Sequence, residues 1–428
     1  MWRLIWIKLI FVLLSFIGKQ NTYAQFGWTW TEMEEMPIPI SNNAVTTGSV
    51  AGEIYLYSFG GIDSTKIFSG ITQNSFRYRV SDDTWEEIAP LPTDLPLIAS
   101  AASNVKNRIY IIGGYNVDAS GHEISSNEVI IYDPESNLYV SGGESIPVPI
   151  DDHVQCVWRD SLIYVITGWS NTTNINNVQI YNPSLNTWSE GTEVPNHVNY
   201  KVFGGSGTII GDTIYYYSGA TTSTSFSGNK KIRMGIINPD DPTEIEWSLL
   251  EDGPNKKYRA ACVNYGEKLF WIGGSERTYN YDGLGYDDGT GVPPHQQILT
   301  FNTADSTWEA SDEGPIGVMD LRGIGQIASS IWIICGGMTF DQEVSNKTYM
   351  IQYDPVVVGI EENKNTFNII DRTIQFSGPV EQVKIYGLDG SLLSLSNSPI
   401  IPEEIYGMII VELTPVSGPS IFKKAVLF

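Results

Sequence analysis

The chain is built from short apolar runs that stop abruptly at one or two glycines. The clearest of these is residues 268–274, Lys-Leu-Phe-Trp-Ile-Gly-Gly. The same sequence pattern occurs five more times. The first glycines at the ends of the six runs lie at positions 60, 113, 168, 219, 273 and 336. A unit of about fifty to sixty residues indicates a repeat architecture.

Each copy continues through a polar loop into a second apolar run, which closes on an Asp or Asn turn and leads to an aromatic residue. Short runs rich in Val, Ile, Tyr and Trp, bounded by Gly, Pro, Asn or Asp, are typical of antiparallel strands. No stretch after the first 24 residues keeps a helical period long enough to compete. The chain is therefore predicted to be all-β. The outer aromatic positions are Trp85, Tyr139, Trp188, Trp247 and Trp308.

A double glycine, an aromatic strand and a tryptophan at this spacing resemble the kelch repeat, and the resemblance covers about residues 26–355. It implies a six-bladed kelch-type β-propeller with four strands in each blade. Blade three has Trp169 and blade four has Ala220 where a second glycine is expected, and blade two has Tyr139 in place of tryptophan.

The ends of the repeat array pose a closure problem, because six glycine stops accompany only five complete second halves. The segment 27–33, Gly-Trp-Thr-Trp-Thr-Glu-Met, has the composition of an outer strand. We predict that Trp28 or Trp30 completes the last blade, which would join the chain ends and remove exposed sheet edges.

The first 24 residues have the features of a secretory signal peptide: early positive charge at Arg3 and Lys8, an apolar core, and a small residue at Ala24. The formal net charge of −24 becomes −27 once Arg3, Lys8 and Lys19 are removed with this leader. So acidic a protein repels nucleic acid and anionic membranes. No later stretch has the length of a membrane span. We therefore predict an exported protein without nucleic-acid partners.

Residues 25–355 are predicted to form the propeller, and residues 356–428 a small C-terminal β-sandwich-like domain that begins with a linker. Segments 359–362, 383–390 and 405–407 and the closing Lys423-Lys424 resemble the C-terminal sorting domain of the type IX secretion system of Bacteroidetes, although the usual Pro-Asn-Pro opening is absent. The resemblance implies that the secretion machinery is a partner and that the protein is secreted or held at the outer cell surface. An immunoglobulin-like accessory domain is the alternative.

Candidate ligand-binding residues lie where the innermost strands begin and where the loops after the glycine stops share one face of a propeller. Four cationic or titratable groups occur at the strand entries: His153, Lys201, Arg259 and Arg322. In an acidic protein their convergence would create a local anion site, since guanidinium groups pair with carboxylates in a bidentate manner. The alternative is that the arginines are structural and join neighbouring loops.

Aromatic residues are expected on the same face. Tyr115 and Trp169 follow glycine stops directly, and the longest loop, residues 275–297, contributes further tyrosines. Aromatic planes stack well on the apolar faces of sugar rings, which favours a glycan ligand.

No cofactor or metal is predicted. Galactose oxidase, a copper enzyme of kelch architecture, requires paired histidine ligands, and the four histidines here show no paired spacing. Asp282, Asp287 and Asp288 lack the spacing of an EF-hand loop and are predicted to belong to a mobile acidic loop. The adjacent carboxylates Asp151 and Asp152 are expected to be solvated charges in a turn. Cys156, Cys262 and Cys335 are expected to be buried thiols, with a Cys262–Cys335 disulfide as the alternative.

Two functions remain open. The first is a binding module that recognises a glycan or a protein through its propeller face. The second is an epimerase of an acidic sugar, because exported six-bladed kelch proteins include N-acetylneuraminate mutarotases; fold analogy alone does not establish activity. The binding module is preferred because the sequence names no general base.

Overall fold

A computed structural model describes residues 22–25, 27–140, 142–311 and 314–354 of the propeller region. Beyond these it describes residues 368–370, 373–375, 380–386, 392–398, 400–402, 405, 407–415 and 421–427. Residues 1–21 of the predicted leader, which spans residues 1–24, and the predicted linker lie outside the described residues. The chain divides into two compact units between Tyr353 and Asp354.

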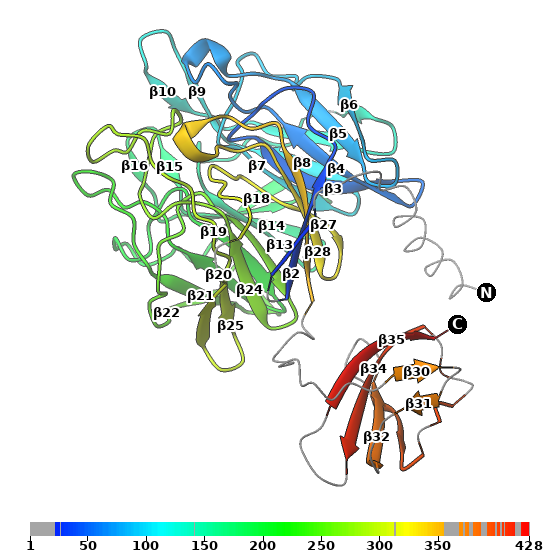
Figure 1. Cartoon of the computed structure of the whole chain (residues 1–428). Helices are drawn as coiled ribbons and strands as arrows, with labels where there is room; N and C mark the ends of the chain where they lie inside the picture. Colours follow the sequence, from blue (N-terminus) through cyan, green and yellow to red (C-terminus); the bar gives the residue numbers. More distant parts are fainter. Residues whose placement is uncertain are drawn as a thin grey trace. The chain divides into compact units, whose positions relative to one another are not determined.

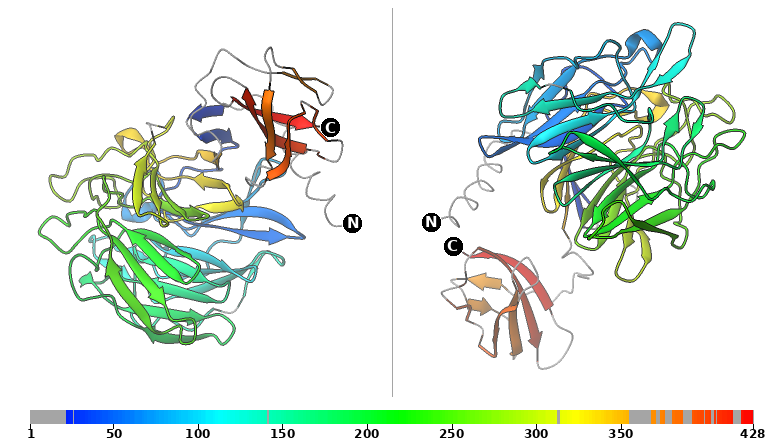
Figure 2. Two further views of the ribbon diagram at one scale, coloured as in Figure 1. Left: turned by 90° about the horizontal axis from the view of Figure 1, so that it is seen from below. Right: turned by 180° about the vertical axis from the view of Figure 1, so that it is seen from behind.

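The first unit is a β-propeller of six antiparallel sheets (Figures 1 and 2). The innermost strands are β3, β7, β13, β19, β23 and β27, and successive ones contact one another from β27 through β3, β7, β13 and β19 to β23. The strands of the blades, from the innermost outward, are β3 (Ala44–Val50), β4 (Glu53–Phe59), β5 (Ser75–Arg79) and β6 (Thr84–Ile88); β7 (Ala101–Val105), β8 (Arg108–Ile112), β11 (Val129–Asp133) and β12 (Leu138–Tyr139); β13 (Val154–Trp158), β14 (Leu162–Ile166), β17 (Val178–Asn182) and β18 (Thr187–Gly191); β19 (Ser206–Ile210), β20 (Thr213–Tyr217), β21 (Ile232–Ile237) and β22 (Ile245–Leu249); β23 (Ala261–Tyr265), β24 (Lys268–Ile272), β25 (Leu299–Asn302) and β26 (Thr307–Ala310); β27 (Gly325–Ala328), β28 (Ile331–Cys335), β29 (Thr348–Tyr353) and β2 (Trp28–Met33).

Smaller elements decorate one end of the blades. They are the strand pairs β9 (Tyr115–Val117) with β10 (Glu123–Ser125) and β15 (Trp169–Ser170) with β16 (Thr173–Asn174), and two short 3₁₀ turns, η1 (Phe68–Gly70) and η2 (Phe340–Gln342). Both strand pairs begin directly after a glycine stop, so these loops rise from the same end of their blades.

The N-terminal strand β2 is the outer strand of the sixth blade. It pairs antiparallel with β29, with Trp28 opposite Tyr353 and Trp30 opposite Ile351. Both tryptophans are buried in the core between the last two blades. The first and last strands of the repeat array therefore share one sheet, which closes the ring. Strand β1 (Thr22–Gln25) adds a further strand to this sheet beyond β2.

The outer tryptophans join each blade to the one before it. The indole N–H of Trp188 donates to the carbonyl of Glu144 at 2.7 Å, and that of Trp247 donates to the carbonyl of Thr192 at 2.8 Å. Trp85 makes the same contact with Glu34, which follows β2. Tryptophan suits these positions because it combines an apolar ring system with one donor that reaches the neighbouring blade, whereas blade two has Tyr139 there.

The glycine stops also connect blades, and here the register predicted for blades three and four is wrong. Each blade ends its second strand with two successive left-handed residues. In blades one, two, three, five and six the second of them donates its N–H to the following blade, as Gly114 does to the carbonyl of Ile150 at 2.9 Å. In blade three these residues are Thr167 and Gly168, so the single glycine holds the second position and Thr167 replaces the first. Blade four has Ser218 and Gly219 in the same order.

A side chain is excluded at these second positions by close approach of the loop that leads into the innermost strand of the same blade. A Cβ on Gly168 would lie 2.8 Å from the carbonyl oxygen of Asp151, and the residue has φ of +117°. Only glycine tolerates both conditions without strain. The first position is no less crowded where it holds glycine, since a Cβ on Gly113 would lie 2.3 Å from the carbonyl oxygen of Ile150. Blades three and four have Thr167 and Ser218 at this position.

The second unit contains a four-stranded antiparallel sheet in the order β33-β32-β34-β35 and a two-stranded sheet of β30 and β31. Its strands are β30 (Asn368–Ile370), β31 (Thr373–Gln375), β32 (Val380–Tyr386), β33 (Leu392–Ser396), β34 (Gly407–Pro415) and β35 (Ile421–Leu427). Its core includes the buried side chains of Val383, Ile385, Val411 and Leu413.

Two further predictions concern membrane-spanning segments and the cysteines. Among the described residues, no helix has the length and apolar character of a membrane span. All three cysteines are free thiols, so the Cys262–Cys335 disulfide alternative is wrong. Burial raises the pKa of Cys156 to about 12, which keeps this thiol neutral.

Candidate functional site

A ring of residues with left-handed backbone surrounds the start of the innermost strands. One residue of each blade occupies this position, with φ between 48° and 63°; in chain order they are Asn42, Ala99, Asp152, Gly204, Arg259 and Asp320. Backbone hydrogen bonds pass from blade to blade at this level. The N–H of Gly204 donates to the carbonyl of Asp152, and the N–H of Arg259 donates to that of Gly204, both at 2.8 Å. The ring therefore joins the loops on this face of the propeller to one another.

Of the four cationic candidates, only Arg259 stands at a ring position. His153 follows the ring residue of its blade by one position, Arg322 follows Asp320 by two, and Lys201 precedes Gly204 by three. The structure brings Arg259, Arg322 and His153 together but does not place the Lys201 side chain among them. The four candidates therefore differ in their sequence distance from the ring residue of their blade.

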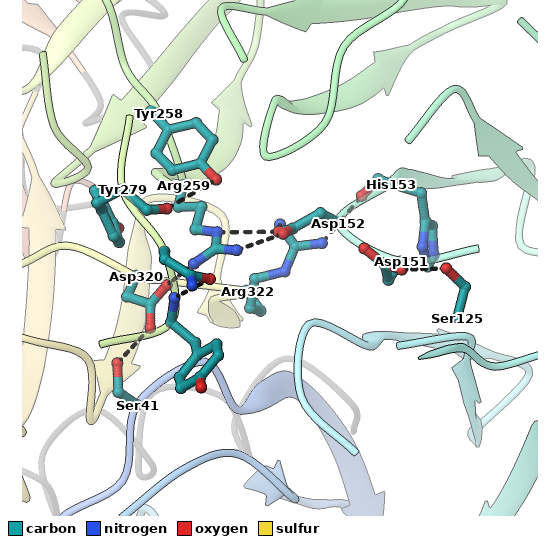
Figure 3. Close-up of polar contacts among 12 residues, drawn as sticks. Ser41, Ser125, Asp151, Asp152, His153, Tyr258, Arg259, Tyr279, Asp320 and Arg322 are labelled. Atoms are coloured by element: carbon teal, nitrogen blue, oxygen red, sulfur yellow. Dashed lines mark hydrogen bonds and ion pairs between the residues drawn. The ribbon is translucent and has the colours of Figure 1, made fainter. Parts of the chain in front are cut away.

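Arg259 crosses the centre of the propeller (Figure 3). Its guanidinium group forms a bidentate pair with Asp152 of blade three, with Nε–Oδ1 and Nη2–Oδ2 distances of 3.1 and 2.5 Å. Its Nη1 donates to Asp320 of blade six at 3.0 Å, and the other oxygen of Asp320 accepts the hydroxyl of Ser41 of blade one at 2.7 Å. One side chain thus links blades five, three and six.

Arg322 completes the network. Its Nη1 lies 3.1 Å from Oδ1 of Asp152, and its Nη2 donates to the carbonyl of His153 at 3.2 Å. The rings of Tyr258 and Tyr279 flank the Arg259 guanidinium, with centroids 5.2 and 5.4 Å from it. Two guanidinium groups and two carboxylates therefore balance one another in charge.

The prediction of a free anion site at this position is wrong, because the carboxylates of the chain itself occupy both arginines. Arg259, Asp152 and Asp320 are at most 2% exposed. Burial opposes ionisation of Asp152, but the charges of Arg259 and Arg322 hold its pKa below the ordinary value. Burial raises the pKa of Asp320, against the attraction of Arg259. The structural role considered for these arginines is the one that the geometry supports.

His153 is buried and neutral. Its Nε2 lies 3.0 Å from Oε1 of Gln155, and its Nδ1 has no hydrogen-bond partner. Burial lowers its pKa to about 4, and the nearby charge of Arg322 acts in the same direction. His153 therefore supplies no positive charge to an anionic ligand at neutral pH.

A pocket opens on this face beside the ring. It contains about 350 Å³ of space free of protein atoms, part of it continuous with solvent. Its lining comes from loops of blades two to five and consists of Tyr115, Glu123, Asp151, Asp152, Trp169, Phe203, Phe226, Arg259 and Tyr286. The predicted aromatic residues Tyr115 and Trp169 and the predicted Arg259 all line it, whereas His153, Lys201 and Arg322 do not.

Aromatic rings form one wall of the pocket. Trp169 contacts Phe203 and Phe226 edge to face, with centroid distances of 5.6 and 5.5 Å. Phe226 in turn meets Tyr286, at 4.9 Å. Tyr286 comes from the long loop of blade five, which Arg277 ties down through ion pairs to Asp287 and Asp288. These aspartates are thus paired rather than free.

Carboxyl groups also line the pocket, and the expectation that Asp151 and Asp152 are solvated is wrong: they are 3% and 2% exposed. Asp151 Oδ2 accepts the hydroxyl of Ser125 at 2.5 Å. Burial, followed by the charge of Asp152, raises the pKa of Asp151 well above its ordinary value. Burial also raises the pKa of Glu123.

Sequence reasoning missed Phe203, Phe226, Glu123 and the ring carboxylate Asp320. The sequence offered one indication of Asp320, since it stands in blade six where Arg259 stands in blade five and follows Val318-Met319 directly. Phe226 and Glu123 lie within irregular loops, and no period of the chain marks them.

Comparison with known proteins supports the repeat assignment. The Kelch motif model matches residues 99–144 and 159–195. This chain contains kelch repeats. Kelch repeat and BTB domain-containing protein 12 of Danio rerio is 28% identical over 46% of this chain and 32% of its own length. Kelch-like protein 25 of Xenopus tropicalis is 22% identical over 51% of this chain and 35% of its own length. The chain thus spans about a third of these kelch relatives.

A solved structure, that of YjhT, shares the fold. It matches with a TM-score of 0.61 and 16% sequence identity, over 77% of this chain and 99% of its own. At this identity the likeness establishes the kelch propeller architecture and nothing about the ligand.

Proposed function

We propose that this protein is an exported kelch-propeller binding module. It recognises a glycan or a protein through the pocket that loops of blades two to five line. The observation that carries the proposal is a pocket with an aromatic wall and a carboxyl wall at the loop face. Pockets that combine apolar surface with a few convergent polar groups are the usual ligand sites of proteins. Kelch relatives that bind proteins through this architecture support the same class of function.

Export and surface location form part of the proposal. They rest on the leader of residues 1–24 and on the similarity of residues 356–428 to a type IX sorting domain. In that arrangement the secretion machinery handles the C-terminal unit, and the propeller carries the recognition site outside the cell.

The test compares two tryptophans of blade three. Trp169 lines the pocket, whereas Trp188 lies on the outer strand β18, and both are partly exposed. Mature wild-type protein and the Trp169→Ala and Trp188→Ala variants are screened against glycan arrays and surface-protein extracts. Ligands retained by wild type and Trp188→Ala but lost by Trp169→Ala support the pocket. Ligands bound equally by all three would place recognition elsewhere.

The second candidate is a sugar epimerase, and Asp151 favours it, because a buried carboxyl with a raised pKa suits acid or base catalysis. The paired state of Arg259 and Arg322 argues against an acidic sugar as substrate. Anomer exchange of N-acetylneuraminic acid, followed by NMR, decides between them. Exchange above the buffer rate that is lost in Asp151→Asn would establish the enzyme; no acceleration would remove it for this sugar.

A further inference from the structure

The charges around the pocket do not balance. Asp152 and Asp320 are matched by Arg259 and Arg322. Beyond these four groups, the pocket lining contains two more carboxyls, Asp151 and Glu123, and neither forms an ion pair within the described part of the chain. A buried carboxylate without a cation is costly. The protein therefore presents two carboxyls to the pocket that lack a counter-charge.

Polar atoms at the pocket also lack partners. The Oδ2 atom of Asp151 accepts the Ser125 hydroxyl, but no described group donates to Oδ1. The hydroxyl of Tyr115 likewise has no hydrogen-bond partner among the described residues, although this side chain is only 3% exposed. Both side chains line the pocket, so these two oxygens are available to a ligand that donates hydrogen bonds.

The aromatic wall suits a positive charge. Trp169, Phe203, Phe226 and Tyr286 lie within one cluster of edge-to-face contacts. Aromatic faces attract ammonium groups by about 0.5–2 kcal/mol, most strongly for tryptophan and in desolvated sites. A neutral sugar would use the same rings but would leave both carboxyls uncompensated.

We propose that the pocket binds an organic cation, a ligand whose ammonium group lies between the aromatic wall and the carboxyls of Asp151 and Glu123. This inference rests on the proposed function, because it names the chemical class recognised by the same pocket. The ammonium would donate to Asp151 Oδ1 and supply the missing counter-charge. The ammonium group can belong to a lysine side chain of a protein or to an amino sugar of a glycan.

Release of protons on ligand binding provides an independent test of the proposal. Asp151 faces the Ser125 hydroxyl and lies near the charges of Asp152, Glu123 and Arg259, while Glu123 also lies near His122. Burial raises the pKa of both carboxyls. A bound cation favours their ionised forms and therefore lowers both pKa values. Binding is therefore expected to release protons and to weaken as pH falls.

The experiment titrates full mature protein with two matched pairs of probes by calorimetry in buffers of different ionisation enthalpy. The pairs are N-acetyl-lysine methylamide against its Nε-acetylated form, and glucosamine against glucose. We expect at least one amine probe to bind at least tenfold more tightly than its neutral partner and to release protons. Asp151→Asn and Glu123→Gln should each weaken that binding at least fivefold, whereas Glu190→Gln, an exposed carboxylate on β18, should not.

The two amine probes distinguish the sources of the ammonium group. Equal affinity for each amine and its neutral partner, or no effect of Asp151→Asn, would overturn the cation proposal. If ligands from the array screen still required Trp169, the pocket would remain a binding site for a neutral ligand. Absence of binding by either amine would likewise overturn the cation proposal, and the binding-module proposal would then be decided by the Trp169 comparison alone.

Discussion

Removal of the Arg259 guanidinium is expected to destabilise the propeller because it leaves buried charge without a partner. In Arg259→Met, Asp320 retains only the Ser41 hydroxyl, while Asp152 retains Arg322. Breaking a buried ion pair by removing one partner costs about 3–5 kcal/mol. The cost should lie near the upper end, because three blades lose a common contact.

Arg159 is a closely matched control. It also has a left-handed backbone, with φ of 49° against 48° for Arg259, and it forms a bidentate pair with an aspartate, Asp212. It also stacks on an aromatic ring, that of Trp158 at 4.5 Å. The pair is exposed, however, with side-chain exposures of 51% and 35%. Exposed pairs contribute about 0.2–1 kcal/mol, so Arg159→Met should be nearly neutral.

Thermal unfolding provides the assay. Unfolding entropy is about 2.1 cal/mol/K per residue, or about 0.7 kcal/mol/K for a propeller of about 330 residues. Arg259→Met should therefore lower Tm by about 4–7 °C, against at most about 1.5 °C for Arg159→Met. Adding Asp320→Asn should restore part of the loss, since it removes the uncompensated charge. Equal losses in the two single variants, or no recovery in the double variant, would refute the reasoning.

The remaining predictions concern backbone, closure and pH. Gly273→Ala should destabilise strongly, because φ is +68° and a Cβ would lie 2.3 Å from the Val318 carbonyl oxygen; Gly266→Ala, with φ of +55° and no atom within 4 Å, should cost only about 1–2 kcal/mol in urea unfolding. Trp30→Ala should cost about 3–5 kcal/mol by loss of the closing core, and an unchanged urea midpoint would contradict that closure. His153 has a pKa of about 4 when folded against 6.5 ordinarily, so the stability it confers is present above pH 6.5 and is lost as pH falls towards 4, by about 3 kcal/mol in all. His153→Asn should flatten this part of the stability curve.

The repeat and the blade count follow from local rules that any reader of the chain can apply. Strands alternate with turns because Val, Ile, Tyr and Trp fit a pleated, half-buried surface, and glycine is required where the next loop approaches closely. The tryptophan period is visible because the indoles of Trp85, Trp188, Trp247 and Trp308 make the same contact with the preceding blade. The N-terminal segment could be assigned to the sixth sheet because the end of the repeat array supplies only three strands for that blade.

The sequence by itself thus determined the all-β propeller and the face on which loops gather, and it named Tyr115, Trp169 and Arg259. Only the tertiary structure showed that the arginines at the site are neutralised and do not give it a positive charge. Charges from blades three, five and six that are far apart in the chain meet at one ring, and there Asp152 and Asp320 neutralise the arginines. Asp151 is likewise buried in the folded chain, although its sequence position suggests an exposed turn. Burial and pairing depend on distances between distant residues, and no periodicity along the chain records those distances.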